Sequence, residues 1–188
     1  KAFNYAIDRE SIVTYTLQGE GRAAIYGIVP PAFKGYDYEA VQGYTFEPER
    51  ARLLLAEAGY PNGENFPALT LQLNSGGSRN VQIAEVIQKQ LKENLNIDVE
   101  LNVMPWAQQL ENLETGKALF WRTGWIADYP DPENFLNLLY GGHIPEKLSD
   151  KSYVNSVRYR SAVFDSLFSL AQREVDDAKR AELYKEAD

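Results

Sequence analysis

Residues 69–103 alternate between strand and helix patterns, and this stretch constrains the fold more than any other part of the chain. The runs 69–74 and 97–103 predict strands, and residues 79–95 between them carry apolar side chains at helical spacing. The helical face consists of Ile83, Val86, Ile87 and Leu91, and the second strand presents Ile97, Val99, Leu101 and Val103. A strand, a crossover helix and a second strand form a βαβ unit with parallel strands and a right-handed crossover. The sequence therefore predicts an α/β fold.

Helix start and stop signals place further helices on either side of this unit. Asp8 fits a helix N-cap, Pro48 fits the first turn of a helix that Gly59 ends, and Asp131-Pro132 is another start signal. The helices expected from these signals span residues 8–17, 48–58, 107–115, 135–140, 161–175 and 177–188. The apolar face of the second consists of Leu53, Leu54, Leu55 and Ala58. A third apolar run at 118–125 predicts another strand.

Composition excludes several classes of protein. The chain has 188 residues, 44% of them apolar, which is typical of a globular domain. It carries 19 basic against 27 acidic residues, a net charge of −8, so we expect no nucleic-acid partner. There is no cysteine, which excludes disulfides and thiolate metal sites, and no apolar run approaches the ~20 residues of a membrane helix. The chain begins at Lys1 and ends at Asp188 inside an expected helix, so we expect both ends to be cut from a longer chain.

Patterns of catalysis or metal binding are sparse. His143, the single histidine, follows two glycines in a loop, and no G-x-S-x-G motif accompanies it. Asp128, Asp131 and Glu133 suggest an oxygen-rich cation site, but their spacing does not match a calcium loop and Asp131 already caps a helix. We predict no metal and no cofactor. A hydrolase that uses an acidic pair near Asp128 stays open as an alternative, because 27 acids are available.

The glycines at 76 and 77 suggest a second possible site. The run 75–78 could hold an anion at the start of the following helix, or it could be a flexible loop with Ser78 as N-cap. Ligands of parallel sheets lie beyond the carboxyl ends of the strands, which places them near 74–79 and 104–106.

The segment 121–132 has the composition of a ligand cleft. Two tryptophans, a tyrosine, one arginine and an acid not needed as a cap lie at the end of a predicted strand. Ligand clefts favour a few polar groups among aromatic walls. The alternative is that Trp121 and Trp125 are buried core residues.

Residues 124–136, with the sequence GWIADYPDPENFL, resemble the signature region of the family 5 extracellular solute-binding proteins, the oligopeptide and dipeptide receptors of ABC importers. Other segments resemble the same family in the same order. They are residues 4–9 (NYAIDR), 29–31 (VPP), 51–61 (ARLLLAEAGYP), 83–97 and 178–187 (AKRAELYKEA). The resemblance covers nearly the whole chain.

The resemblance implies that residues 1–188 form a single ligand-binding lobe of a two-lobed receptor that closes over its ligand. It implies an α/β lobe like that of type II periplasmic binding proteins, with a mixed sheet flanked by helices. The second lobe would lie elsewhere in the same longer chain. The receptor would be exported to the periplasm or the cell surface, and it would deliver peptides to the permease subunits of an ABC transporter. It would not be an enzyme.

The resemblance also implies roles for particular residues. Asp128 matches the aspartate that pairs with the terminal ammonium of a peptide, and Arg122 matches a position that can meet the peptide carboxylate through paired hydrogen bonds. Arg79 is a second residue for that task. The remaining expected contacts are the backbone of Gly124, Trp125, Ile126 and Ala127, which would add a peptide as a strand, and the side chains of Trp106, Trp125, Tyr129 and Asn74.

The resemblance leaves the ligand class open. The run 118–121 reads Ala-Leu-Phe-Trp where relatives commonly have a Phe-Asp pair, and the family also contains binders of nickel chelates and sugars. Three functions therefore stay open beside peptide capture: a receptor for a non-peptide solute, a hydrolase or transferase near Asp128, and an interaction module without a small ligand.

Overall fold

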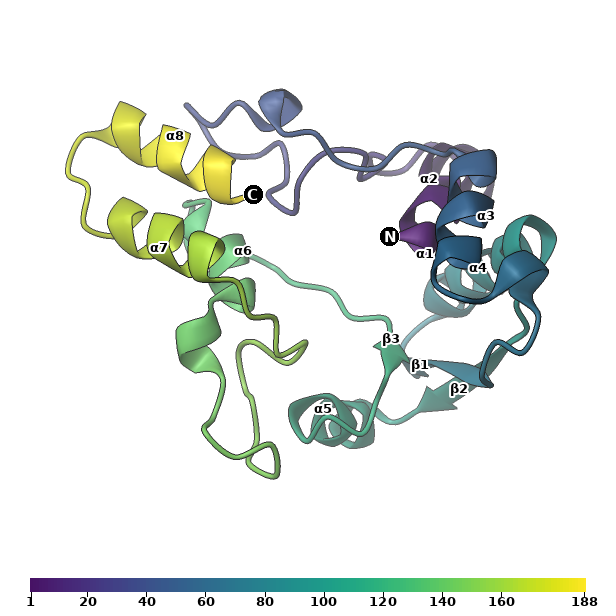
Figure 1. The fold of residues 1–188 in the computed structure, drawn as a ribbon. Helices are drawn as coiled ribbons and strands as arrows, with labels where there is room; N and C mark the ends of the chain where they lie inside the picture. Colours follow the sequence, from purple (N-terminus) through teal and green to yellow (C-terminus); the bar gives the residue numbers. More distant parts are fainter. The chain divides into compact units, whose positions relative to one another are not determined.

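The computed structural model describes residues 1–188, which form two compact units. Unit 1 consists of residues 1–25, 44–109 and 119–123, and unit 2 of residues 26–43, 110–118 and 124–188. Figure 1 shows the order of the elements along the chain. No helix combines the length and the apolar character that crossing a membrane requires. Whether the two units together form one ligand-binding lobe stays a prediction.

Unit 1 contains a parallel sheet of three strands in the order β2-β1-β3. They are β1 (Leu69–Asn74), β2 (Val99–Met104) and β3 (Phe120–Trp121). Leu69 pairs with Val99 and Gln72 pairs with Trp121, both in parallel register. The predicted α/β fold with its βαβ unit is thus confirmed. The expected mixed sheet needs a correction in one detail: every strand pair is parallel, because a helix and not a hairpin connects each strand to the next.

The helices of unit 1 follow most of the predicted signals, but the helix at 2–6 was not predicted, and the expected helix over 8–17 is a three-residue α-helix followed by a π-helical turn. They are α1 (Ala2–Ala6), α2 (Arg9–Ser11), the π-helical turn η1 (Ile12–Thr16), α3 (Pro48–Glu57), α4 (Ser78–Leu95) and residues 106–109 of α5 (Trp106–Glu114). The carboxylate of Asp8 accepts a hydrogen bond from the Ser11 N–H at 2.9 Å, so Asp8 caps α2 as expected. Ser78 is not the cap of α4; Gly77 occupies that position, with a φ of 131° that favours glycine.

The core of unit 1 lies between α4 and the sheet. Leu71 and Leu73 of β1 are buried together with Leu91 and Leu95 of α4. The inward face of α4 is therefore Ala84, Ile87, Leu91 and Leu95, whereas the predicted face included the half-buried Ile83 and Val86. Ala84 stands where the helix passes the sheet, and its small side chain permits a close approach.

Three other expected core residues are exposed. Leu53 of α3 is 66% exposed and Val103 of β2 is 45% exposed, and Ala58 is exposed as well. Of the predicted face of α3, Leu55 is buried and Leu54 packs partly buried against the core, and Ala51 completes the buried face. Val103 is exposed because β2 is an edge strand, in which only the first and last residues, Val99 and Met104, are buried.

Unit 2 is mainly helical. It contains α6 (Glu133–Leu136), α7 (Ala162–Ala171) and α8 (Asp177–Ala187), with 3-10 turns at 38–40, 137–139 and 141–143. Ser161 caps α7 and Asp176 caps α8 with side-chain oxygens. The two helices lie side by side (Figure 1), and Phe168 of α7 and Tyr184 of α8 are buried between them.

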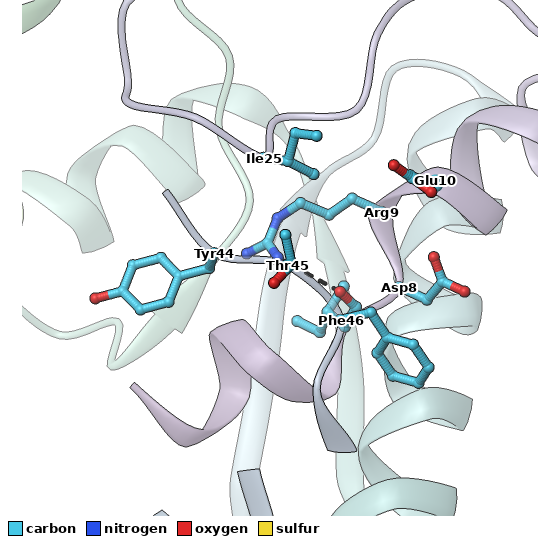
Figure 2. Close-up of a pocket in the computed structure, with 8 residues that line it drawn as sticks. Asp8, Arg9, Glu10, Ile25, Tyr44, Thr45 and Phe46 are labelled. Carbon is cyan, nitrogen blue, oxygen red and sulfur yellow. Dashed lines mark hydrogen bonds between the residues drawn. The ribbon is translucent and has the colours of Figure 1, made fainter. Parts of the chain in front are cut away.

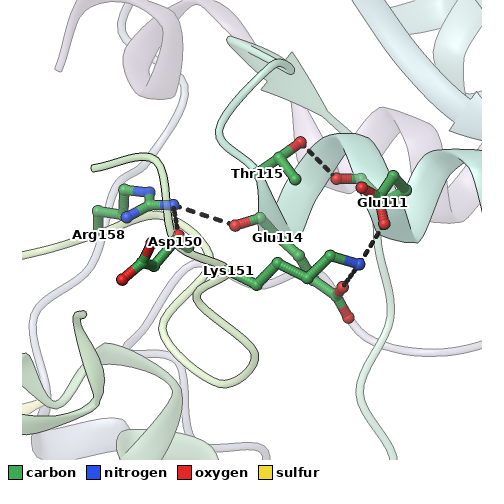
Figure 3. A network of polar contacts seen from close by, with 6 residues as sticks. All are labelled: Glu111, Glu114, Thr115, Asp150, Lys151 and Arg158. Atoms are coloured by element: carbon green, nitrogen blue, oxygen red, sulfur yellow. Dashed lines mark hydrogen bonds and ion pairs between the residues drawn. The ribbon is translucent and has the colours of Figure 1, made fainter. Parts of the chain in front are cut away.

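The end of α8 and the loop 147–160 are each held by polar contacts. The carboxylate of Asp188 accepts hydrogen bonds from the Ile28 N–H at 2.6 Å and the Tyr36 hydroxyl at 2.8 Å. Figure 3 shows how the loop is held: Lys151 pairs with Glu111 and Glu114 of α5, and the Arg158 guanidinium donates to the Glu114 carbonyl. These contacts fix segments that have no regular structure.

Candidate functional site

The loop Gly124–Pro130 of unit 2, between β3 and α6, contains six of the predicted site residues. Its side chains are mostly exposed: Trp125 is 47% exposed, Ile126 89% and Tyr129 46%. Trp125 is therefore not a core residue. Exposed large apolar side chains so close together are typical of a contact surface.

Asn134, at the second position of α6, holds this loop in place. Its side-chain oxygen accepts a hydrogen bond from the Trp125 indole N–H at 2.6 Å and a long one from the Asp128 backbone N–H at 3.4 Å. Asn134 is only 5% exposed. One buried amide thus sets the orientation of both the tryptophan and the aspartate. The residue pattern of 124–136 does not single out Asn134 as a support of the loop. The signal for this role is a polar residue on the buried side of a short helix.

Of the three acids in this region, only Asp128 has a carboxylate without a partner. Asp131 accepts a hydrogen bond from the Glu133 N–H at 2.9 Å, which confirms it as a helix cap, and pairs with Arg180 of α8 at 2.6 Å. Glu133 accepts hydrogen bonds from the Tyr129 hydroxyl and from Gln172. The bond to Glu133, followed by partial burial, raises the pKa of Tyr129. Asp128 is exposed, and its side chain makes no hydrogen bond or ion pair within the chain.

Asp131 and Glu133 are thus occupied within unit 2. An acid pair for hydrolysis would require one of them beside Asp128, yet Asp131 is neutralised by Arg180 and Glu133 is hydrogen-bonded twice. No group of three or more acids and histidines in the chain has a geometry that could hold a metal ion. His143 lies in a 3-10 turn with its ring nitrogen 2.6 Å from the Asn137 side chain, as expected of a loop residue.

The backbone of the loop is also free. The N–H and C=O groups of Gly124, Trp125, Ile126 and Ala127 make no hydrogen bond within the chain. Free backbone groups in consecutive residues seek partners in water or in another chain. This geometry suits the addition of an extended peptide as a strand.

In unit 1, the predicted residues lie at the carboxyl ends of the three strands. Asn74 is the last residue of β1, Trp106 follows β2 and begins α5, and Arg122 follows β3. The Arg122 N–H donates to the Gln72 carbonyl at 2.8 Å, which extends the β1 and β3 pairing by one residue. Its guanidinium has no hydrogen bond or ion pair within the chain. The parallel sheet therefore brings these three residues to one edge, as the strand pattern indicated.

Arg79 has a different environment. Its guanidinium forms an ion pair with Glu20 at 2.7 Å, and both side chains are more than half exposed. It is therefore the one arginine of the predicted site that already has a carboxylate partner in the chain.

The comparisons with known proteins agree with this arrangement. Residues 1–145 match the family described as bacterial extracellular solute-binding proteins, family 5 middle. The chain is 32% identical to the oligopeptide-binding protein OppA of Bacillus subtilis and 33% identical to heme-binding protein A of Haemophilus influenzae. In both cases the whole chain is covered, but only 34% and 33% of the relative. The chain thus spans about a third of the length of these relatives.

A solved structure gives the same result for the fold. A periplasmic oligopeptide-binding protein of Borrelia burgdorferi superposes with a TM-score of 0.82 and 35% identity, over 99% of this chain and 35% of the other. The parallel sheet with its flanking helices and the similarity to this structure identify the chain as a segment of a solute-binding protein. The chain belongs to the family 5 bacterial extracellular solute-binding proteins. This family is one of binding proteins and not of enzymes, so the hydrolase alternative is wrong.

Proposed function

We propose that the chain is the ligand-binding lobe of an ABC importer receptor and that it captures peptides. The observation that carries the proposal is the unpaired carboxylate of Asp128, whereas the two acids that follow the loop, Asp131 and Glu133, have partners within the chain. An exposed carboxylate beside aromatic side chains suits the ammonium at the start of a peptide. Such a pair is worth far more in an enclosed, drier cleft than in water.

Three further features support a peptide as the ligand. The free backbone of 124–127 offers hydrogen bonds that do not depend on the side chains of the peptide. Trp125 and Tyr129 present half-exposed rings as walls. The unpaired guanidinium of Arg122 is suited to a carboxylate, through two parallel hydrogen bonds.

The lobe would be part of a longer receptor with a second lobe, and closure of the two would enclose the ligand. Its partners would be the permease subunits of the transporter, and its location the periplasm or the cell surface, as the names of its relatives suggest. A heme-binding relative makes a non-peptide solute the second candidate.

Replacement of Asp128 tests the proposal in the full receptor. We expect Asp128→Asn to lower the affinity for a tripeptide several hundredfold or more, because the loss of one partner from an enclosed ion pair costs roughly 3 to 5 kcal/mol. Thermal stability should hardly change, since the carboxylate has no partner in the chain. Calorimetric titration and a thermal melt measure the two effects.

An N-acetylated tripeptide is the matched control. It should bind the parent receptor weakly and lose little more on Asp128→Asn, because it carries no ammonium. Equal affinities of the free and acetylated peptides for the parent receptor would refute the ammonium site. Binding of a non-peptide solute with no response to any peptide would favour the second candidate.

A further inference from the structure

A pocket lies in unit 1, and none of the residues that line it belongs to the proposed peptide site. It has a volume of about 320 Å³, enough for a molecule of the size of an amino acid. Figure 2 shows its lining, which comes from the turn between α1 and α2, the start of α2, Ile25 and the segment that precedes α3. The residues are Ile7, Asp8, Arg9, Glu10, Ile25, Tyr44, Thr45 and Phe46.

Arg9 is the only basic residue in the lining, and its hydrogen bonds fix the guanidinium. Nη1 donates to the carbonyl oxygens of Asn4 at 2.8 Å and Ile7 at 3.4 Å, and Nη2 donates to the Asn4 side chain at 2.9 Å. An arginine carries five N–H donors. The Nε–H and one Nη2–H therefore have no partner in the chain. These two donors form a fork that matches a carboxylate.

The charge of Arg9 is not balanced by any acid of the chain. No carboxylate forms an ion pair with the guanidinium, which is half-buried, and this burial lowers the pKa of Arg9. The Asp8 carboxylate caps Ser11 instead. In Figure 2 the Asp8 and Glu10 carboxylates point away from the Arg9 guanidinium, which extends toward Thr45 and Ile25. Partly buried charges are usually paired, so this guanidinium suits an external anion.

The remaining lining selects the kind of anion. The apolar surface of the lining comes from Ile25, Tyr44 and Phe46. Phe46 is 43% exposed. Asp8 and Glu10 at the rim repel a ligand with several negative charges. A monovalent carboxylate with an apolar body fits both conditions, whereas a phosphate does not.

We propose that this pocket binds a small organic acid, with its carboxylate on the Nε and Nη2 edge of Arg9 and its apolar part against the apolar side of the lining that includes Phe46. The proposal does not rest on the peptide site, because none of the lining residues belongs to the loop Gly124–Pro130 or is one of the predicted residues at the ends of the strands.

The test uses 3-phenylpropionate and its neutral amide as matched probes on the full-length protein. Neither carries an ammonium, so neither recruits Asp128. We expect saturable binding of the acid and at least about tenfold weaker binding of the amide, since hydrogen bonds to charged groups contribute that much. Chemical-shift changes in the NMR spectrum should be centred on residues 7–10 and 44–46.

Two variants test the residues. Arg9→Lys keeps the charge but removes the planar fork, and Phe46→Ala removes an exposed ring; each should lower the affinity for 3-phenylpropionate about tenfold or more. If Arg9→Lys lowers the melting temperature, its loss of affinity could come from a weakened fold. The affinity of Phe46→Ala for 3-phenylpropionate then still tests the pocket. Arg173→Gln, at an exposed arginine of unit 2, is the control and should leave the affinity unchanged.

Three outcomes would overturn the proposal. One is the absence of saturable binding, and another is equal affinity for the acid and the amide. The third is a loss of affinity on Arg122→Gln but on neither Arg9→Lys nor Phe46→Ala, which would mean that the carboxylate binds at the sheet edge.

Discussion

Asn134 determines the geometry of the candidate site more than any residue that would touch a ligand. It is buried, and a single side-chain oxygen accepts from both the Trp125 indole and the Asp128 backbone. Asp128 itself contributes no internal bond, so it is available for function. At the scale of single residues, the structure separates those that support the loop from those that are free to bind.

We expect Asn134→Ala to destabilise the protein by about 1 to 3 kcal/mol, because the partners of the buried amide lose their acceptor. In a Trp125→Phe background, which lacks the indole N–H, the same substitution should cost less. Chemical denaturation of the four proteins in this double-mutant cycle measures the difference. Strictly additive effects would mean that the bond between Trp125 and Asn134 does not form.

Tyr36 gives a prediction about alkaline pH. Burial, and secondly the Asp188 carboxylate, raise the pKa of Tyr36 in the folded protein. The unfolded chain ionises first, at a pH of about 10. The stability contributed by the neutral hydroxyl is thus fully present below that pH and is lost as the pH rises above it.

The melting temperature should therefore fall as the pH increases through about 10. The slope should be smaller in Tyr36→Phe, which cannot ionise at this position. Some slope should persist, because burial also raises the pKa of Tyr184. Identical slopes in the parent and in Tyr36→Phe would contradict the assignment.

At the scale of elements, position on the helix decides which leucines stabilise the fold. Leu53 and Leu55 are two residues apart in α3, yet Leu53 is 66% exposed and Leu55 only 3%. The difference arises because α3 packs on one side, against α1 and α4. The same argument applies in α4, where the fully buried Leu91 contributes more than the half-buried Ile87.

We expect Leu55→Ala to lower the free energy of unfolding by about 2 to 5 kcal/mol, as for a typical core truncation. Leu53→Ala is the matched control and should change it by less than about 0.5 kcal/mol. Urea denaturation distinguishes the two. A similar cost for both substitutions would show that the inward face of α3 is wrongly assigned.

At the scale of the whole molecule, length is the relevant quantity. The chain spans about a third of its relatives, although it contains both the sheet edge with Arg122 and the loop with Asp128. An enclosed ligand gains affinity because closure of the two lobes removes water from the cleft and brings groups of both lobes against the ligand.

We therefore expect the 188-residue chain alone to bind di- to pentapeptides much more weakly than a full receptor that contains it. Calorimetric titration of the chain alone with these peptides should show little heat of specific binding. Micromolar or tighter binding by the chain alone would mean that a second lobe is not needed, and the two-lobed proposal would be wrong.

The amino-acid sequence by itself determined the local features of this protein. Its apolar spacing and caps predicted β1, α4, the parallel pairing with β2, and the caps at Asp8 and Asp131, because such signals act over a few residues. The motif at 124–136, together with the other segments that resemble the family in the same order, indicated the family.

Only the tertiary structure decided which of these residues are buried and which are free. The sequence marks Asp131 as a helix start, but it does not show that Arg180, which neutralises Asp131, lies beside it, because Arg180 is 49 positions away in α8. The burial of Leu55 and the exposure of Leu53 likewise depend on which side of α3 packs against α1 and α4. Local patterns carry no record of these partners, because a side chain's burial and charge balance are set by what packs around it.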